Sequence, residues 1–377
     1  MPQIPVAVFM TSFEPGGTER QMTELIRRLD PRRYRVHAVC FRREGAWLPR
    51  VLEHTASVVE FPVSGFANLK TMRQMLRFAA WCRRERIAVV HTCDFYSNVF
   101  GLPGAFMGGV RVRVGSRREL NPDKSDAQIR LQRFAYRCAT TVVANSPAAA
   151  EVLRTEGVAA SKVTVIANGL DGRAHDGPPR PRDRHVRRIV TVANLRPEKS
   201  HETLIAAAAM IATACPELRY QIVGDGARRG ELESLARERG VERITEFLGH
   251  REDVPALLAA SDVFVLPSRS EAFPNGAIEA MAAGLPVVAS AVGGLLDLIE
   301  SGRTGILVPP SDPEPLAAAL QALYNDPARA SEIGAAARRD VLARYSFDRM
   351  VAAFEALYES ELHARHGMRA EAAHAGI

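Results

Sequence analysis

Short apolar runs alternate with longer amphipathic segments along most of the chain. An apolar run of about 4–8 residues between turn residues is typical of a buried strand, whereas apolar positions that recur every three or four residues are typical of a helix. Such alternation predicts parallel sheets with helices on both faces. In the first half, helices are predicted in residues 18–29, 69–86 and 126–139, and strands in residues 4–10, 35–41, 56–61, 87–92, 110–116, 140–146 and 162–168.

The alternation stops at residues 171–188, which are rich in Pro, Gly and Arg and have no apolar period. We interpret this stretch as a linker between two domains, residues 1–170 and residues 189–346. Ligands of doubly wound sheets bind at the carboxyl ends of the strands, so a cleft between two such domains is expected to hold the site. The second domain is predicted to contain strands in residues 187–194, 217–226, 243–250, 262–268 and 286–290, and a helix is expected in residues 347–365, followed by a frayed tail.

Composition places the chain among globular proteins, with 47% hydrophobic and 24% charged residues in a length of 377. Five scattered cysteines without a C-x-x-C pair indicate reduced thiols in a cytoplasmic protein. The apolar N-terminus lacks a basic leader, so it is interpreted as a first strand and not as a signal peptide. No stretch reaches the ~18 apolar residues that a membrane helix requires.

The positive charge lies in the first half of the chain. Residues 1–170 hold 25 Lys and Arg against 14 Asp and Glu, a net charge of +11, and the rest holds 24 against 29, a net charge of −5. This asymmetry favours an anionic partner for the first domain, such as a membrane surface, a phospholipid-like substrate or a nucleic acid. A merely solvated basic surface is the alternative.

Two carboxylates bracket the start of a predicted helix in the stretch SEAFPNGAIEAMAAGLPVVA. Glu271 precedes the helix and Glu279 lies one turn inside it. Pro274 suits a first helical position, and Gly276 permits close approach of another group to the backbone. Free amides at a helix N-terminus bind anions or polar sugars. A solvated Glu and a Glu paired with Arg form the alternative, which we set aside because both acids flank FPNG.

Two bases stand where a second helix of this domain begins, in the segment LRPEKSHETL. The positive end of a helix dipole disfavours Arg196 and Lys199 unless an anion lies between them, and a diphosphate would fit. Ser200 is expected to cap the helix through its hydroxyl. Surface charges balanced by neighbouring glutamates are the alternative.

Other candidates are less specific. Gly16 and Gly17 form a predicted strand-to-helix turn before a capping box, Thr18-x-x-Gln21, and their bare backbone is suited to a phosphate or an acceptor. An ordinary tight turn is the alternative. His91 ends a strand at the edge where ligands bind, although a lone His there is more often structural. The turns after two later strands are suited to a nucleobase or to an ordinary reversal, and no metal-ligand spacing or P-loop is present. The residues of these two turns that are singled out for the donor are Gly224, Gly249 and His250.

An ordered set of motifs from about Gly16 to Val308 resembles the retaining glycosyltransferases of family 4, which have the GT-B fold. The set comprises GGTER, NSPAAAEVL, VIANGLD, LRPEK, IVGDG, FLGH and EAFPNGAIEAMAAGLPVVAS. The resemblance implies two Rossmann-like domains facing across a cleft, with a final helix, about residues 347–366, packing back on the first domain. It implies transfer of a sugar from a nucleotide diphosphate sugar to a saccharide or lipid-linked acceptor, without a cofactor or metal.

The resemblance also implies roles for individual residues. Glu279 would bind the ribose and Glu271 would face the sugar, while Arg196 and Lys199 would neutralise the diphosphate. His91 would contact the sugar from the other domain. The amides at Phe273, Asn275 and Gly276 would surround the sugar and diphosphate, and Gly16 and Gly17 would approach the phosphates. The acceptor side is expected to include Glu19, Arg117 and Arg118.

Two positions depart from the family pattern: Asp297 stands where a Glu is common, and Cys93 stands where a second His is common. Both concern the sugar pocket.

UDP is favoured over GDP as the donor nucleotide. The enzyme is expected in the cytoplasm, on the inner face of a membrane. The expected pathway is cell-envelope polysaccharide or glycolipid synthesis. A nucleotide-sugar epimerase, which would convert donor without acceptor, and a basic nucleic-acid binder remain alternatives.

Overall fold

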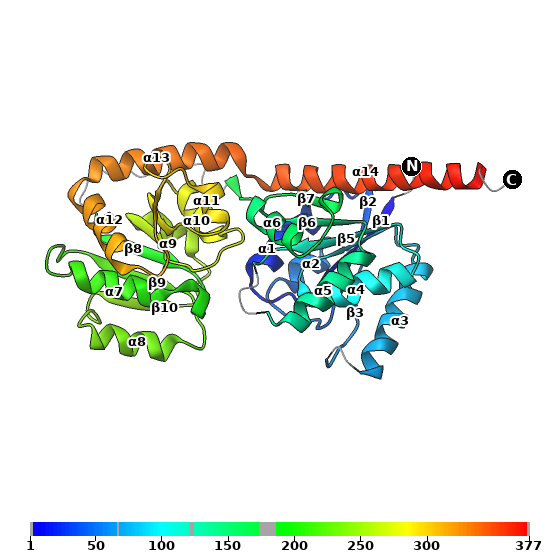
Figure 1. The fold of residues 1–377 in the computed structure, drawn as a ribbon, viewed down its shortest axis with the longest axis horizontal. Coiled ribbons are helices and arrows are strands. Elements are labelled where there is room, and N and C mark those ends of the chain that lie inside the picture. Colours follow the sequence, from blue (N-terminus) through cyan, green and yellow to red (C-terminus); the bar gives the residue numbers. More distant parts are fainter. Residues whose placement is uncertain (1–2, 66–67, 121–123, 173–185, 375–377) are drawn as a thin grey trace. The chain divides into compact units, whose positions relative to one another are not determined.

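The computed structural model describes residues 3–65, 68–120, 124–172 and 186–374, and it divides into two compact units (Figure 1). Unit 1 comprises Met1–Gly169 and Phe347–Ile377, and unit 2 comprises Leu170–Ser346. The predicted linker falls largely on residues 173–185, which lie outside the described ranges.

Unit 1 is built on a seven-stranded parallel sheet in the order β3-β2-β1-β4-β5-β6-β7. Its strands are β1 (Ile4–Met10), β2 (Tyr34–Cys40), β3 (Ser57–Glu60), β4 (Val89–Thr92), β5 (Val112–Arg117), β6 (Thr141–Ala144) and β7 (Val163–Val165). Its helices are α1 (Gly17–Arg28), α2 (Leu48–Leu52), α3 (Leu69–Arg84), α4 (Phe95–Met107), α5 (Asp126–Cys138), α6 (Pro147–Thr155) and α14 (Phe347–His374), with a 3-10 turn η1 (Ala160–Lys162).

Unit 2 is built on a six-stranded parallel sheet in the order β10-β9-β8-β11-β12-β13. Its strands are β8 (Arg188–Val192), β9 (Arg219–Val223), β10 (Thr245–Gly249), β11 (Val263–Leu266), β12 (Val287–Ser290) and β13 (Ile306–Val308). Its helices are α7 (His201–Ile211), α8 (Arg229–Glu238), α9 (Val254–Ala260), α10 (Asn275–Ala282), α11 (Gly294–Leu298), α12 (Pro313–Asn325) and α13 (Pro327–Arg344), with a 3-10 turn η3 (Pro197–Lys199).

The predicted fold class, two doubly wound parallel-sheet domains, is confirmed. In each sheet the strand order reverses beside the first strand of the unit: β1 lies between β2 and β4, and β8 lies between β9 and β11. The loops that leave the two strands at such a point diverge to opposite faces of the sheet, which opens a crevice at the carboxyl edge. Each unit therefore has one position where a ligand is expected.

Helix α14 belongs to unit 1 and closes its core, although it follows all of unit 2 in the sequence. Phe347, Phe354 and Tyr358 are buried in the same apolar cluster as the inner face of β1 and β2. The Tyr358 hydroxyl lies 2.7 Å from Nδ1 of His91, and the Ser116 hydroxyl lies 2.9 Å from Nε2 of the same ring. A histidine of β4 thus ties the last helix to the sheet.

Several local expectations were wrong or incomplete. Helix α4 and strand β13 were not predicted; α4 has no charged residue and contains Pro103, and it is buried along most of its length, so its sequence carries no polar face to set a period. The chain is helical as far as His374, where a frayed tail was expected. The Thr18-x-x-Gln21 capping box does not form, because the Gln21 amide exchanges two hydrogen bonds with the backbone of Gly169.

The pH dependence of stability follows from His91. Its ring is fully buried, and burial lowers its pKa from 6.5 to about 3. The unfolded chain therefore binds a proton below pH 6.5 that the folded chain refuses, so stability is full above about pH 6.5 and falls as the pH drops towards 3. At pH 5 we expect a loss of about 2 kcal/mol from this residue.

Denaturant unfolding of the wild type and of His91→Gln between pH 7.5 and pH 5 measures the effect. The variant should be less stable at pH 7.5 but should lose less stability on acidification. Burial also lowers the pKa of His37 and His201, which act in the same direction, so the difference between the two proteins is the diagnostic quantity. If the free energy of unfolding fell equally with pH in both proteins, His91 would not be the cause of the loss.

Candidate active site

Two loops of unit 2 meet at its switch point. The loop after β8 contains η3, and the loop after the neighbouring strand β11 leads into α10. The Arg269 amide of the second loop donates a hydrogen bond of 2.8 Å to the Glu198 carbonyl of the first. This backbone link holds the two loops together, so predicted residues that are 72 positions apart in the sequence become neighbours.

The carboxylate of Glu271 is the centre of this arrangement. Its Oε1 accepts a hydrogen bond of 2.6 Å from the Lys199 ammonium and one of 2.7 Å from the Ser268 hydroxyl. The Glu271 side chain is 7% exposed and that of Lys199 is 22% exposed. A buried carboxylate requires such partners, and this pair places one negative and one positive charge at the mouth of the crevice.

Arg196 does not join that pair. Its side chain is 67% exposed, and its nearest carboxylate is Glu198 at 4.0 Å. The backbone then turns sharply at Ser200, a left-handed residue with φ 52°. The predicted hydroxyl cap is wrong: the Ser200 hydroxyl lies 2.9 Å from the Thr203 hydroxyl and accepts no bond from a helix amide.

Helix α10 begins beside β8, with Pro274 as the residue before its first turn. A Cβ at Gly276 would lie 2.9 Å from the Val192 carbonyl, so only glycine lets this turn approach the strand end so closely. The first-turn residues Asn275 and Gly276 are half-buried, and Glu279 is half-buried one turn later. Phe273 packs edge-on against Tyr345, 5.4 Å between ring centres.

The turns after β9 and β10 line the same edge of the sheet. Gly224 has φ 135° and would place a Cβ 2.1 Å from the Ala193 carbonyl, so this turn packs directly on the loop that carries Arg196. The Gly224 amide donates to the Gly249 carbonyl at 2.8 Å, and His250 is exposed beyond it. The residues of unit 2 that were predicted to bind the donor therefore follow four adjacent strands, β10, β9, β8 and β11, at the carboxyl edge of one sheet.

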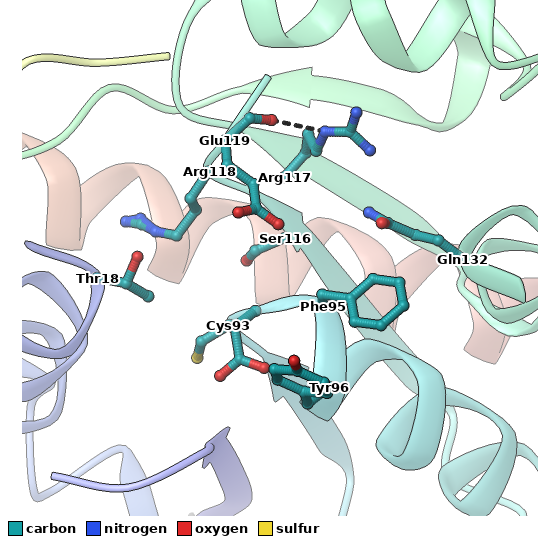
Figure 2. Close-up of a pocket in the computed structure, with 10 residues that line it drawn as sticks. Thr18, Cys93, Phe95, Tyr96, Ser116, Arg117, Arg118, Glu119 and Gln132 are labelled. Carbon is teal, nitrogen blue, oxygen red and sulfur yellow. Dashed lines mark hydrogen bonds between the residues drawn. The ribbon is translucent and has the colours of Figure 1, made fainter. Parts of the chain in front are cut away.

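Unit 1 has a cavity of about 220 Å³ at its own switch point (Figure 2). It lies where α1 and α4 begin and where β5 ends. Asp94 caps α4, and burial raises the pKa of its carboxyl. The cavity is lined by Thr18, Cys93, Asp94, Phe95, Tyr96, Ser116, Arg117, Arg118, Glu119 and Gln132.

Two of the predicted acceptor-side residues differ in what their side chains do. The Arg117 guanidinium is bound by both oxygens of Glu156 at 2.8 and 3.0 Å and by the Glu119 carbonyl at 2.7 Å. The Arg118 side chain extends towards Thr18 in Figure 2, and its terminal nitrogens contact the Asn168 amide oxygen. Its Nε is buried without a hydrogen-bond partner, and burial lowers its pKa to about 10. Arg118 is thus the better placed of the two for an anionic ligand.

The remaining first-half candidates are Gly16, Gly17, Glu19 and His91. Gly17 begins α1, and a Cβ at Gly16 would collide with the carboxylate of Glu19, 2.2 Å away. His91 has 0% exposure and both ring nitrogens hydrogen-bonded inside unit 1. The structure therefore offers no exposed His91 atom for a sugar, and the structural role of a lone strand-end histidine is the one observed.

Some residues of these sites were not singled out from the sequence. Ser268 precedes Glu271 by three residues, which is a readable signal, because a hydroxyl at that spacing can reach back to a carboxylate in a turn. Tyr96 and Gln132 reach the cavity of unit 1 only through the packing of α4 and α5, so their sequence positions carried no signal.

Within the described residues, no group of three or more His, Cys, Asp or Glu could hold a metal ion.

In comparison with known proteins, each half of the chain matches a family model of glycosyltransferases. Residues 15–173 match the family model described as Glycosyltransferase Family 4, and residues 179–340 match that of Glycosyl transferases group 1. The glycogen synthase of Mycobacterium tuberculosis H37Rv is 34% identical over 211 residues, which cover 55% of this chain and 51% of that protein. The chain thus spans about half the length of that relative.

A longer alignment and solved structures agree. A D-inositol 3-phosphate glycosyltransferase of Streptomyces scabiei is 28% identical over 93% of this chain and 87% of that protein. The structure of Anabaena Alr3699/HepE in complex with UDP and glucose superposes with a TM-score of 0.84 at 24% identity, covering 95% of this chain and 100% of the other. The fold is therefore GT-B, as expected, and the family matches support a glycosyltransferase like those of family 4.

The different environments of Arg117 and Arg118 predict different mutant phenotypes. Arg117→Met leaves Glu156, whose side chain is only 12% exposed, without its partner, and should cost about 3–5 kcal/mol in the free energy of unfolding. Arg118→Met removes an incompletely paired cation and should cost clearly less. Urea unfolding of both variants measures the contrast. Equal losses would show that Arg118 is as structural as Arg117.

Proposed function

We propose that this family-4-like GT-B glycosyltransferase transfers a sugar from a UDP-sugar to a saccharide or lipid-linked acceptor with retention of anomeric configuration. One observation carries the proposal: Lys199 and Glu271, 2.6 Å apart, meet beside the N-terminus of α10 at the switch point of unit 2. A cation for a diphosphate, a carboxylate for a sugar and the positive end of a helix dipole for an anion are gathered there.

The roles of the donor-side residues follow from their chemistry. The Lys199 ammonium has one strong partner, Glu271, and an ammonium carries three donors, so it retains capacity for a phosphate oxygen. Arg196, exposed one turn earlier, would add a second cation as the diphosphate enters. Glu271 would accept hydrogen bonds from sugar hydroxyls, and Glu279 from ribose hydroxyls. Phe273, Asn275 and Gly276 would present backbone amides.

The proposed reaction proceeds on one face of the sugar. The bond between the anomeric carbon and the diphosphate oxygen breaks, the acceptor oxygen bonds to that carbon from the same side, and the acceptor proton passes to the departing phosphate. The enzyme would stabilise the growing charge on the diphosphate and the oxocarbenium-like carbon, a task of electrostatics and positioning. Lys199 and Arg196 would supply the positive charge that neutralises the departing diphosphate, with no metal or cofactor in the step.

Support for the partners comes from different observations. UDP is bound in the Anabaena HepE structure, which favours a uridine nucleotide here. The cavity of unit 1, with Arg118 at its wall, is proposed as the acceptor site. The basic first half of the chain favours an acceptor at an anionic membrane, consistent with cell-envelope polysaccharide or glycolipid synthesis on the cytoplasmic face.

The proposal is tested in two stages. A thermal-shift screen with UDP, GDP and ADP and their common sugars should show the largest stabilisation with a UDP-sugar, because a ligand that binds only the folded state raises its stability. Proton NMR of the product formed with that donor, in buffer containing a chelator, should then show the anomeric configuration of the donor. An inverted product, or transfer that requires an added divalent metal, would refute the corresponding part of the mechanism.

Kinetic analysis of two variants tests the donor site. Lys199→Met removes a charge-assisted donor that acts on the leaving group, so turnover should fall by about 10²–10³-fold. Glu279→Gln weakens a ribose contact that is present in both ground and transition states, so the donor KM should rise with less effect on kcat.

Controls separate these effects from misfolding. Lys199→Met also leaves Glu271 with Ser268 as its partner, so the thermal midpoint of each variant is measured beside its kinetics. Asp225→Asn, at an exposed position on the β9 turn, provides a matched charge change nearby. Full activity of both Lys199→Met and Glu279→Gln at saturating and limiting donor would show that the donor binds elsewhere.

A further inference from the structure

Helix α3 of unit 1 carries an exposed apolar stripe along its outer side. Leu69, Met72 and Leu76 are 89%, 52% and 53% exposed, and their spacing of three and four residues places them on one face of the helix. The helix is capped by Asn68 and buries Phe78 and Trp81 on its inner side. The stripe is therefore a surface feature of a well-anchored helix.

A row of bases runs beside this stripe. At about 100° per residue, Lys70, Arg73, Arg77 and Arg84 fall next to the apolar positions, on the side of α3 away from α4. Residues 69–84 contain five bases and no acid. Within the described part of the chain, neither Lys70 nor Arg73 forms an ion pair. An apolar stripe flanked by cations is the pattern of a helix that lies in the plane of an anionic lipid surface.

The neighbouring helices extend the apolar surface. Helix α4 packs between α3 and α5, and it approaches α3 closely through Gly104, next to Met75 and Phe78. It has no charged residue. Helices α4 and α5 also expose large apolar side chains, which are Tyr96, Phe106 and Met107 of α4 and Leu131 and Phe134 of α5.

This surface reaches the cavity of unit 1 at Tyr96, which is exposed and also lines the cavity. Gly104 of α4 lies near Met75 of α3, and Gly108 lies near Ala79, so the two helices run in the same direction. The first turns of α3, which carry the stripe, consequently lie at the same end as the start of α4. Tyr96 stands there, exposed on the surface and lining the cavity. A bilayer against this face would bring lipid headgroups to the cavity mouth.

We propose that the outer face of α3 and the exposed ends of α4 dock on an anionic lipid bilayer, with Leu69, Met72 and Leu76 inserted among the headgroups and the bases on lipid phosphates. The proposal names the docking surface for the membrane-located acceptor proposed above, and it does not depend on the transfer chemistry. Charge argues against a second copy as occupant, because two such faces would oppose like charges. A nucleic acid would match the bases but leave the apolar stripe unused.

The first test is cosedimentation of the purified chain with vesicles of phosphatidylcholine, with or without an equal part of phosphatidylglycerol. Binding should require the anionic lipid and weaken between 50 and 500 mM salt, because each base near the surface contributes about 1 kcal/mol, which is about 5-fold in affinity. The combined variant Lys70→Gln, Arg73→Gln and Arg77→Gln should therefore bind roughly 100-fold more weakly at low salt.

A matched control removes the same charge elsewhere. Arg237, Arg239 and Arg243 are exposed bases of unit 2, and their combined change to Gln should leave vesicle binding within about 2-fold of the wild type. An equal loss in the control and in the α3 variant would overturn the proposal in favour of a diffuse charge effect. Duplex DNA bound as tightly as the vesicles, with no dependence on the apolar stripe, would overturn it in favour of a nucleic-acid surface.

The second test addresses insertion. Leu76→Trp should show a blue-shifted emission with anionic vesicles and quenching by lipids brominated near the headgroup end of the acyl chain. Leu296→Trp, at an exposed leucine of unit 2, should show neither. Both are compared with the wild type, which contains two tryptophans. Equal responses of both variants, or none, would overturn the docking geometry.

The apolar stripe is also tested by deletion. The combined variant Leu69→Ser, Met72→Ser and Leu76→Ser should lose vesicle binding while keeping the thermal midpoint and its transfer rate to a water-soluble acceptor. A reversible dimer that this variant abolishes, in a protein without vesicle affinity, would assign the face to self-association instead. Failure of transfer in the wild type with every donor would refute the proposed function and leave the vesicle result standing by itself.

Discussion

Both units depend on one constraint. A central strand pairs in parallel with a neighbour on each side, and these two neighbours come from different points of the chain. Because β1 and β8 each receive a partner on both sides, the connections leave them in opposite directions and a crevice opens at the carboxyl edge. The cavity of unit 1 and the Lys199–Glu271 pair of unit 2 both lie at these points. The strand order therefore determines where both candidate sites lie, independently of their side chains.

Close backbone approach converts these crevices into defined sites. Gly276 brings the start of α10 against the end of β8, and Gly224 brings the β9 turn against the loop that carries Arg196. Gly294 lies so close to the Ala272 carbonyl that a Cβ would stand 2.1 Å from it, and its amide donates to the Glu271 carbonyl. Removing these contacts would free the loops, so the glycines act on the site by positioning Glu271.

Buried charge is handled differently in the two units. In unit 2, Glu271 is compensated by Lys199 and Ser268 in a geometry that retains donor capacity for a ligand. In unit 1, Arg117 is fully engaged by Glu156, whereas the buried Nε of Arg118 has no partner. A buried cation with an unsatisfied donor is unfavourable in isolation, which supports the proposal that the acceptor binds in that cavity.

The alternation of apolar runs with amphipathic segments determined the two parallel-sheet domains, because strand and helix periods are local properties of the chain. The helix start that follows Lys199 and the helix start at FPNG were also readable, since helix starts carry local signals. The capping box at Thr18 failed because Gln21 finds a partner 148 residues away, at Gly169, and His91 turned inward because α14 arrives from the far end of the chain to hold it. The buried helix α4 lacked a polar face and therefore a readable period. Which cations pair internally and which remain available was decided only by the tertiary structure, because burial and partner distance depend on segments that no local pattern brings together.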